Sequence, residues 1–224
     1  MRKSLFFVCI RNVLSRQTKA TRRQKRAENA SGLSSVSLRR ILTSFLFLFS
    51  NMNYKIRAAV KEDCKEIYRM IVELSVYEKV PDKVKITQED LERDGFGQNP
   101  FFECLVAEVP EEHKSKEGRT AVGYALYACA YSTWNGRSIC LEDLYVMQEF
   151  RGKGIGKGLL RKVAEEGKKK QCQKLQLTVL DWNKSAREFY AANGAVDITE
   201  SEGRHVISFH GQNLDNLANE APKD

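Results

Sequence analysis

The chain has 224 residues, of which 42% are hydrophobic, so it is long enough for one domain of ordinary size with a proper core. Its net charge of +8 would indicate an anionic partner, but eleven of the 37 Lys and Arg residues lie in residues 1–51, against one of the 29 Asp and Glu residues, Glu28. Residues 52–224 therefore hold 26 basic and 28 acidic side chains. That balance argues against a nucleic-acid partner.

The six cysteines are scattered along the chain. None forms a CxxC pair, and only three histidines are present, so neither a zinc site nor a disulfide framework is predicted and no metal is expected. Most of the cysteines lie in apolar strand or helix patterns, where a small buried thiol is the simplest interpretation. This usage favours a reducing compartment.

Residues 1–51 form a basic extension that resembles a mitochondrial transit peptide in composition. Its apolar run at 41–50 is ten residues long, too short to span a bilayer, and no membrane partner is expected. The interpretation we favour is that Met52 is the working start, because patterned structure begins at Tyr54. We expect disorder over about 1–40 and a cytoplasmic protein, or a mitochondrial one if the extension acts as a transit peptide.

The first predicted elements are one strand and two helices. Alternation over 54–60 predicts the strand. Apolar residues at helical spacing predict an amphipathic helix over 61–80. A short helix is predicted over 87–97, with Thr87 as its cap and Asp90 in the capping-box position.

Long strands follow in the middle of the chain. They are predicted at 101–109, 121–133 and 137–147, and a turn signal at 134–136 joins the last two. The glycine-rich stretch and its helix come next, at 149–170.

The last predicted elements are a strand at 174–180, a helix near 184–193 capped by Asn183, and a hairpin formed by 195–199 and 204–210. This order of elements predicts an α/β fold with a mixed, mostly antiparallel sheet flanked by helices.

The predicted organisation therefore has three parts. The basic extension covers 1–51, one domain covers 52–215, and a C-terminal tail covers 216–224.

The stretch EFRGKGIGKG at 149–158 has the glycine content of a phosphate-binding loop. A Walker A loop needs G-x-x-x-x-G-K-[ST] and a dinucleotide fingerprint needs G-x-G-x-x-G, and the glycine spacing here fits neither. What remains, Arg151 to Gly156, resembles the R-G-x-G-[IVL]-G pyrophosphate loop of the GNAT superfamily of acyl-CoA N-acyltransferases. Glycines let backbone N–H groups approach one anion, and the following helix adds its positive N-terminal dipole.

A second stretch, LTVLDWNKSAREFYAANGA, resembles the same superfamily, whose members usually carry a strand ending in Asn and then a helix with a Tyr. Asn183 can cap that helix and contact the pantetheine arm of the cofactor. Tyr190 lies seven residues on, two turns along the same face, where a phenol can lie beside the CoA sulfur. A core aromatic is the alternative for Tyr190, since Phe189 adjoins it.

At finer grain, residues 52–210 resemble the diamine acetyltransferase family, which comprises spermidine/spermine N-acetyltransferase and a paralogue acting on thialysine. The resemblance is carried by DGFGQNPFFECLVAEVP, STWNGRSICLEDLYVM, EFRGKGIG and VLDWN, and the thialysine branch looks nearer. It implies an acyltransferase that moves an acetyl group from acetyl-CoA, as co-substrate, to a small cationic amine. The family works as a homodimer whose active sites use residues of both subunits.

The resemblance also implies roles for individual residues. Glu142 matches the residue that accepts the amine proton through water, and Tyr190 matches the general acid that protonates the departing thiolate. The positions that match contacts to acetyl-CoA are Leu144, Tyr145, Val146, Arg151, Gly152, Lys153, Gly154, Ile155, Gly156, Lys157, Asn183, Lys184, Ser185 and Ala186. The positions assigned to the amine pocket are Tyr77, Glu78, Ser132, Asp143, Gln176, Leu177, Thr178 and Glu202.

The chemistry of an amine explains why acids are needed. A cationic amine is no nucleophile until it loses a proton, so a nearby carboxylate both attracts the cation and provides a proton exit. Glu142 and Asp143 would face opposite sides of a regular strand, whereas a bulge would change this and free backbone N–H groups to polarise the thioester carbonyl. An exposed strand end is the weaker alternative for these two acids.

Two positions depart from the family. Ser132 stands where the polyamine-specific enzyme has an acid, and Arg204 stands where the family usually has Trp. Our hypothesis is that the substrate is an amino-acid-like amine carrying a carboxylate rather than spermine. The alternatives are an acetyltransferase for protein lysines or N-termini, a non-catalytic acetyl-CoA-binding interaction module, and a nicotinamide-binding oxidoreductase, which the glycine spacing disfavours.

Overall fold

A computed structural model describes residues 53–203 and 205–222 of the chain. The predicted N-terminal extension and Arg204 lie outside the described residues. The chain divides into two compact units, the first ending at Leu177 and the second beginning at Thr178. In the described part of the chain, no helix combines the length and the apolar character needed to cross a bilayer.

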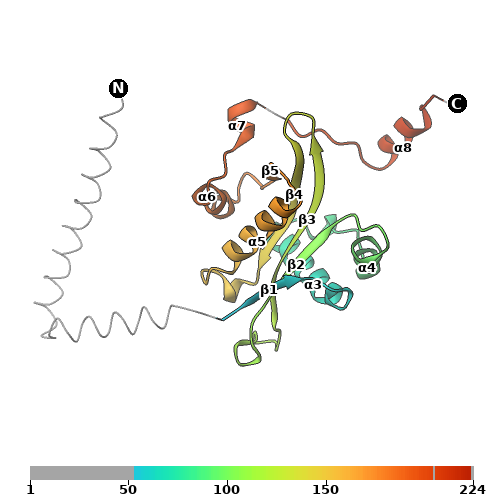
Figure 1. Ribbon diagram of the computed structural model, residues 1–224. Helices are drawn as coiled ribbons and strands as arrows, with labels where there is room; N and C mark the ends of the chain where they lie inside the picture. The colour runs from blue at the N-terminus through green and yellow to red at the C-terminus, as the bar shows by residue number, and fades with distance from the viewer. Residues whose placement is uncertain (1–52, 204, 223–224) are drawn as a thin grey trace, which may run out of the picture. The chain divides into compact units, whose positions relative to one another are not determined.

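The first unit is built on a five-stranded sheet (Figure 1). In their order across the sheet, the strands are β1 (Lys55–Ala58), β2 (Glu103–Glu108), β3 (Ala121–Ser132), β4 (Gly136–Val146) and β5 (Lys174–Leu177). The first four pair antiparallel, and β5 runs parallel to β4. The predicted mixed, mostly antiparallel α/β sheet is confirmed, although the strand predicted over 174–180 ends at Leu177.

The helices of the first unit are α3 (Cys64–Tyr77), α4 (Gln88–Phe96) and α5 (Ile155–Lys169), with 3₁₀ turns at 61–63, 81–83, 111–113 and 148–150. Helix α4 begins as predicted. The Thr87 side chain accepts from the Asp90 N–H, and the Asp90 carboxylate accepts from the Thr87 N–H, which completes a capping box. Helix α3 ends before Pro81, which starts a 3₁₀ turn.

Helices cover both faces of this sheet. Gly123 on β3 faces α5, because a Cβ added to it would lie 3.4 Å from Leu159 Cδ1. Tyr145 faces α3, because its hydroxyl donates to Glu73 at 2.9 Å. Gly123 pairs with Val146, the residue after Tyr145, and successive residues of a strand point to opposite faces. The core therefore has two layers, with the sheet between them.

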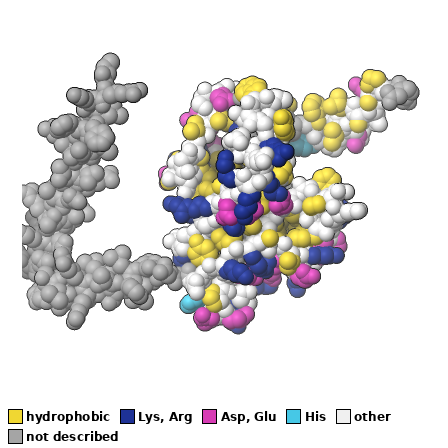
Figure 2. Space-filling view, in the orientation of Figure 1, with side chains coloured by type: hydrophobic (Ala, Val, Ile, Leu, Met, Phe, Trp, Pro, Cys, Tyr) yellow, Lys and Arg dark blue, Asp and Glu magenta, His cyan; other side chains and the backbone are white. Residues whose placement is uncertain are grey.

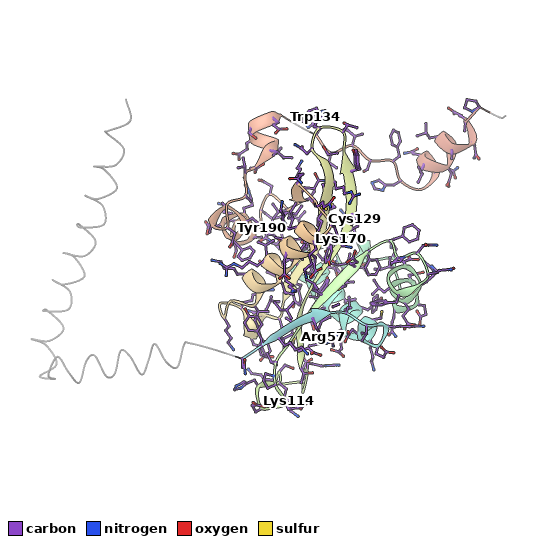
Figure 3. The ribbon with its side chains drawn as sticks, viewed as in Figure 1. Arg57, Lys114, Cys129, Trp134, Lys170 and Tyr190 are labelled. Atoms are coloured by element: carbon purple, nitrogen blue, oxygen red, sulfur yellow. The ribbon has the colours of Figure 1, made fainter. Side chains whose placement is uncertain are left out.

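Ion pairs connect the strands to neighbouring segments, and two of the basic residues involved, Arg57 and Lys170, are labelled in Figure 3. Arg57 on β1 donates to the two carboxylate oxygens of Asp63 at 2.6 and 2.8 Å and to Glu108 on β2 at 2.6 Å. Lys170, which follows α5, donates to Glu103 at the start of β2 at 2.5 Å. These contacts join segments far apart in the sequence into one frame.

Strand β4 carries a β-bulge in its middle. Leu126 pairs with Asp143 and Tyr127 pairs with Leu141, so Glu142 is an extra residue that pairs with no residue of β3. The side chain of Glu142 is exposed, whereas Asp143 is partly buried. The bulge considered from the sequence is therefore present at these two acids.

The second unit contains α6 (Lys184–Ala192), α7 (Ile198–Glu202) and α8 (Gln212–Asn219). Asn183 caps α6 as predicted, since its side chain accepts from the Ala186 N–H at 3.2 Å. The predicted hairpin of 195–199 and 204–210 is wrong, because α7 begins in the first segment and none of the described residues of the second is in a strand. The boundary expected at residue 215 stays a prediction, and α8 runs across it.

Local contacts explain why a helix replaces the first strand of that hairpin. Asp197 caps α7, and Arg187 of α6 donates to both Asp197 and Glu200. The second segment leaves Val206 and Ile207 85% and 78% exposed. An extended segment needs a partner for its backbone groups, and within the described residues this one has no sheet to join.

Candidate active site

The glycine-rich loop presents a cradle of backbone N–H groups. Gly152 and Gly154 adopt the left-handed conformation, with φ of 75° and 87°, which residues with a Cβ disfavour. Gly154 is the N-cap of α5 and offers no side chain to the first turn. The N–H groups at the start of α5 are therefore available to an anion, and the helix dipole adds to their attraction.

Two predicted lysines flank this cradle. Lys153 and Lys157 are exposed, and the Lys153 ammonium lies 5.0 Å from the centroid of the Phe150 ring. Figure 2 shows further basic side chains over α5. Ile155 is buried in the core and Gly156 has no side chain, so these two residues offer backbone groups alone. The loop thus fits a phosphate-bearing ligand.

Arg151, the first residue of the predicted loop, is turned toward β4 and α3. Its Nε donates to the Val146 carbonyl at 2.9 Å. Its guanidinium carbon lies 4.8 Å from the centroid of the Tyr77 ring and 5.6 Å from that of Tyr145. Both are cation–π distances.

Strand β4 extends beyond the end of β5. The two strands pair from Ser138 to Leu141, and beyond that point no further described strand lies beside β4 on this side. The residues predicted to pair with pantetheine, Leu144, Tyr145 and Val146, lie in this stretch. A strand without a neighbour can offer backbone N–H and C=O groups to an extended ligand.

Two carboxyl groups of the predicted amine pocket lie close enough to influence each other. Tyr124, which is fully buried, donates from its hydroxyl to Asp143 at 2.8 Å. Burial raises the pKa of Asp143, and the Tyr124 hydrogen bond opposes part of that rise. Burial, and then the charge of Asp143, raise the pKa of Glu78, the C-cap residue of α3. We call Glu78 and Asp143 the acid pair.

Glu142 lies on the bulge beside the acid pair. Its side chain is exposed, and its charge contributes to the raised pKa of Asp143. An exposed carboxylate at this point can pass a proton to bulk water, as its predicted role requires.

The structure separates Ser132 from the other pocket residues of the first unit. Ser132 lies at the tip of the β3–β4 hairpin, where its hydroxyl accepts from the N–H groups of Trp134 and Asn135 at 3.2 Å. It is six residues along β3 from Leu126, the partner of Asp143, a separation of about 20 Å along a strand. Within one chain, Ser132 therefore does not line the acid pair.

The remaining predicted pocket residues lie at the ends of elements. Tyr77 ends α3 beside Glu78, while Gln176 and Leu177 end β5. Thr178 is exposed at the start of the second unit, and Glu202 is exposed at the end of α7.

The second unit holds the predicted Asn183–Tyr190 element. Asn183 is buried, and Lys184, Ser185 and Ala186 form the first turn of the helix that it caps. Tyr190, labelled in Figure 3, is partly buried. Its ring packs edge-on against Phe189 with centroids 5.2 Å apart. The predicted cap is confirmed, and the proton-donor role of Tyr190 stays a prediction.

Sequence reasoning missed Tyr124 as a residue of the site. The alternation of β3 predicts which face Tyr124 occupies, but its contact with Asp143 depends on the register across the bulge. The contacts of Arg151 were also missed, because its ring partners lie on α3 and β4 and the sequence does not show how these elements pack against the loop.

Comparisons with known proteins find acetyltransferases. The family model for the "Acetyltransferase (GNAT) family" matches residues 58–195. Thialysine N-epsilon-acetyltransferase of Bos taurus is 51% identical over 163 residues, which cover 73% of this chain and 96% of that protein. Human spermidine/spermine N(1)-acetyltransferase-like protein 1 is 39% identical over 170 residues, 75% of this chain and 24% of that protein.

The fold is also found among solved structures. Aminoglycoside N-acetyltransferase AAC(6')-Iy, solved in complex with CoA, superposes with a TM-score of 0.54 at 18% identity, covering 72% of this chain and 97% of that one.

Proposed function

The chain belongs to the GNAT acetyltransferase family and, within it, to the diamine acetyltransferases, and from this premise we propose that it acetylates a primary amine of a small cationic substrate by direct transfer from acetyl-CoA. Membership makes the chain an N-acetyltransferase. The observation that carries the substrate class is the acid pair. Asp143 is partly buried and accepts from the Tyr124 hydroxyl, its charge acts on Glu78, and two carboxyl groups so arranged suit a compact cation.

The glycine loop fits the pyrophosphate of acetyl-CoA. We assign its contacts to backbone N–H groups at 152–156 and to the charges of Lys153 and Lys157. The free side of β4 at 144–146 suits pantetheine, and Asn183 to Ala186 would provide a further contact. The thioester supplies the activated acetyl group.

The reaction needs one group to take a proton from the amine and another to give a proton to the thiolate. The amine enters as a cation beside the acid pair, and Glu142 on the exposed bulge accepts its proton through water. Tyr190 would return a proton to the departing thiolate. Because the amine attacks the thioester directly, no enzyme nucleophile is needed.

We propose that the amine carries a carboxylate, as thialysine does. Ser132 presents a neutral hydroxyl that serves the hairpin turn, so no second anionic anchor for a distal ammonium is offered there. The similarity to thialysine N-epsilon-acetyltransferase supports the same substrate class.

We further propose a homodimer that works in the cytoplasm, without a nucleic-acid or membrane partner. Ser132 can approach an amine pocket only in a partner copy, given its separation from Asp143 in one chain. Exposed apolar side chains of the second unit, Val206, Ile207 and Phe209, also favour association. Sedimentation equilibrium should give twice the chain mass of 25.6 kDa.

An acetyl-CoA turnover screen across small amines tests the activity. We expect kcat/KM for thialysine to exceed that for spermidine by at least about tenfold, the scale of one charge pair. A preference for spermidine would refute the carboxylate-bearing substrate. Absence of turnover with every small amine, together with turnover of lysine peptides, would overturn the substrate class.

The proton-donor role is tested separately with Tyr190→Phe. We expect kcat to fall about 100-fold, the lower end of general acid catalysis, while acetyl-CoA binding by calorimetry stays at the parent value. Unchanged turnover would remove Tyr190 from the mechanism.

A further inference from the structure

The side chain of Arg151 connects the glycine loop to the end of α3. Its Nε bonds the Val146 carbonyl, and its guanidinium lies over the rings of Tyr77 and Tyr145. A planar guanidinium can donate at its edge while its face rests on an aromatic ring, which a lysine ammonium does not reproduce. Arg151 thus contacts a strand and a helix at once.

The phosphate cradle does not depend on this side chain. Backbone N–H groups at 152–156 form it, and Lys153 and Lys157 provide mobile charge beside it. The charge of Arg151 is therefore one of three near the loop, and its guanidinium also lies over the two rings.

The helix end that Arg151 contacts carries half of the acid pair. Tyr77 is the last residue of α3, and the N–H of Glu78 donates to the Leu74 carbonyl at 2.8 Å, so Glu78 takes its position from the end of this helix. Asp143 takes its position from β4. The separation of the two carboxyl groups therefore depends on how the end of α3 rests on β4.

We propose that Arg151 is a positioning residue that couples the glycine loop to the amine pocket. It holds Tyr77, and with it Glu78, against β4 opposite Asp143, and this inference rests on the proposed function. A loop fixed by pyrophosphate also fixes the guanidinium, so acetyl-CoA favours the arrangement that receives the amine. Coupling between two binding sites is reciprocal, and bound amine therefore tightens acetyl-CoA binding by the same factor.

A double-mutant cycle between Arg151→Lys and Tyr77→Leu tests the proposal. The lysine keeps a cation for phosphate but loses the planar stack and the Nε donor. We expect Arg151→Lys to raise the amine KM at saturating acetyl-CoA about fivefold, the scale of a cation–π contact, with the acetyl-CoA Kd in the absence of amine within about twofold of the parent. The double variant should have an amine kcat/KM within about twofold of the weaker single variant, because both remove one interaction.

Two further variants serve as matched controls. Tyr77→Phe keeps the ring and should keep the coupling. Lys153→Gln removes a charge from the other side of the loop, so it should raise the acetyl-CoA KM alone, and its effect should multiply with that of Tyr77→Leu. Circular dichroism checks that each variant folds. If Arg151→Lys does not fold, Tyr77→Leu, which removes the same contact from the side of the ring, takes its place with the same expected result.

The outcomes separate this inference from the proposed function. If the parent enzyme acetylates no small amine, both fall. If it does, and Arg151→Lys raises the acetyl-CoA KM while leaving the amine KM unchanged, or the effects of Arg151→Lys and Tyr77→Leu multiply, then Arg151 is a phosphate ligand and only the coupling is refuted.

Discussion

Asp143 carries a charge that the fold alone would not favour. Its carboxyl group is partly buried, and burial raises its pKa above the usual range. The hydroxyl of Tyr124 offsets part of this penalty, at the expense of holding a phenol fully buried beside an acid. A neutral side chain of the same shape would avoid the desolvation, so we infer that the charge of Asp143 serves the cation proposed for the acid pair.

Asp143→Asn should therefore stabilise the fold and weaken substrate binding. The amide oxygen still accepts the Tyr124 hydrogen bond, while the buried charge is gone. Because the folded-state pKa of Asp143 is raised, its stabilising contribution exists at acid pH and is lost as pH rises through that pKa. We expect a higher urea midpoint than the parent at pH 7, a difference that shrinks on acidification, and an amine KM raised about tenfold.

Glu142→Gln is the stability control for that variant. Glu142 is exposed, and its charge is a smaller cause of the raised pKa of Asp143 than burial is, so removing that charge should raise the urea midpoint at pH 7 less than Asp143→Asn does. A less stable Asp143→Asn protein would show that the carboxylate stabilises the fold, contrary to this account.

The same raised pKa values set the pH dependence of amine binding. Glu78 and Asp143 attract the ammonium only when ionised, and each takes up a proton at a higher pH than an ordinary carboxyl group, whose pKa is about 4. The amine KM should therefore rise on acidification from a pH clearly above that value. The acetyl-CoA KM depends on lysines and backbone N–H groups, so it should not change over the same pH range. Steady-state kinetics from about pH 5 to about pH 8 measure both KM values. If the two KM values changed with pH in the same way, the acid pair would not be the cause.

At the scale of elements, strand β3 is held against β4 and α5 by a position that admits no side chain. A Cβ on Gly123 would lie 2.8 Å from the Tyr145 carbonyl oxygen, which is backbone and cannot rotate away. Gly136, in the turn at the other end of β4, differs: its φ of 78° favours glycine, but the space around it is open. Glycine is therefore required at position 123 by lack of space and at position 136 by backbone conformation.

Gly123→Ala should destabilise the domain more than Gly136→Ala does. Overpacking against backbone costs about 2–3 kcal/mol of unfolding free energy, whereas a left-handed alanine in open space costs about 1 kcal/mol. Urea unfolding of both variants measures the difference. If both variants lost the same unfolding free energy, β4 would be able to shift away from the added methyl group. The close approach at Gly123 would then not be needed for stability.

Sequence patterns predicted the strands and helices of the first unit because those patterns are local. Thr87 and Asp90 cap α4 within four residues, and alternation is visible along β3 itself. The second unit shows where local patterns fail: Val206 and Ile207 sit in a strand-like sequence, yet a strand needs a partner that local sequence does not supply. The same limit applies to the site, where the stack of Arg151 on Tyr77 joins segments 74 residues apart.

At the scale of the whole molecule, the site residues predicted from the sequence are divided between the two compact units. The phosphate cradle, the acid pair and Glu142 belong to the first, and Asn183 with Tyr190 belongs to the second. The acidic balance of residues 52–224 also contrasts with the ten net positive charges of residues 1–51. The charge that would mark the chain as a nucleic-acid binder thus lies outside the part that carries the site.

A protein starting at Met52 should therefore keep the activity. Among the described residues, Tyr54 is the first that contacts the glycine loop, since its hydroxyl donates to the Gly154 carbonyl at 3.3 Å, and the strand itself begins at Lys55. We expect kcat/KM within about twofold of the full chain, since no residue assigned to the site is removed. A start at Ile56 is the control: it deletes Tyr54 and shortens the pairing of β1 with β2, so the acetyl-CoA KM should rise and the melting temperature should fall. If the Met52 start lost activity as the Ile56 start is expected to, residues 1–51 would contribute to folding or to the site, and the extension would not be optional.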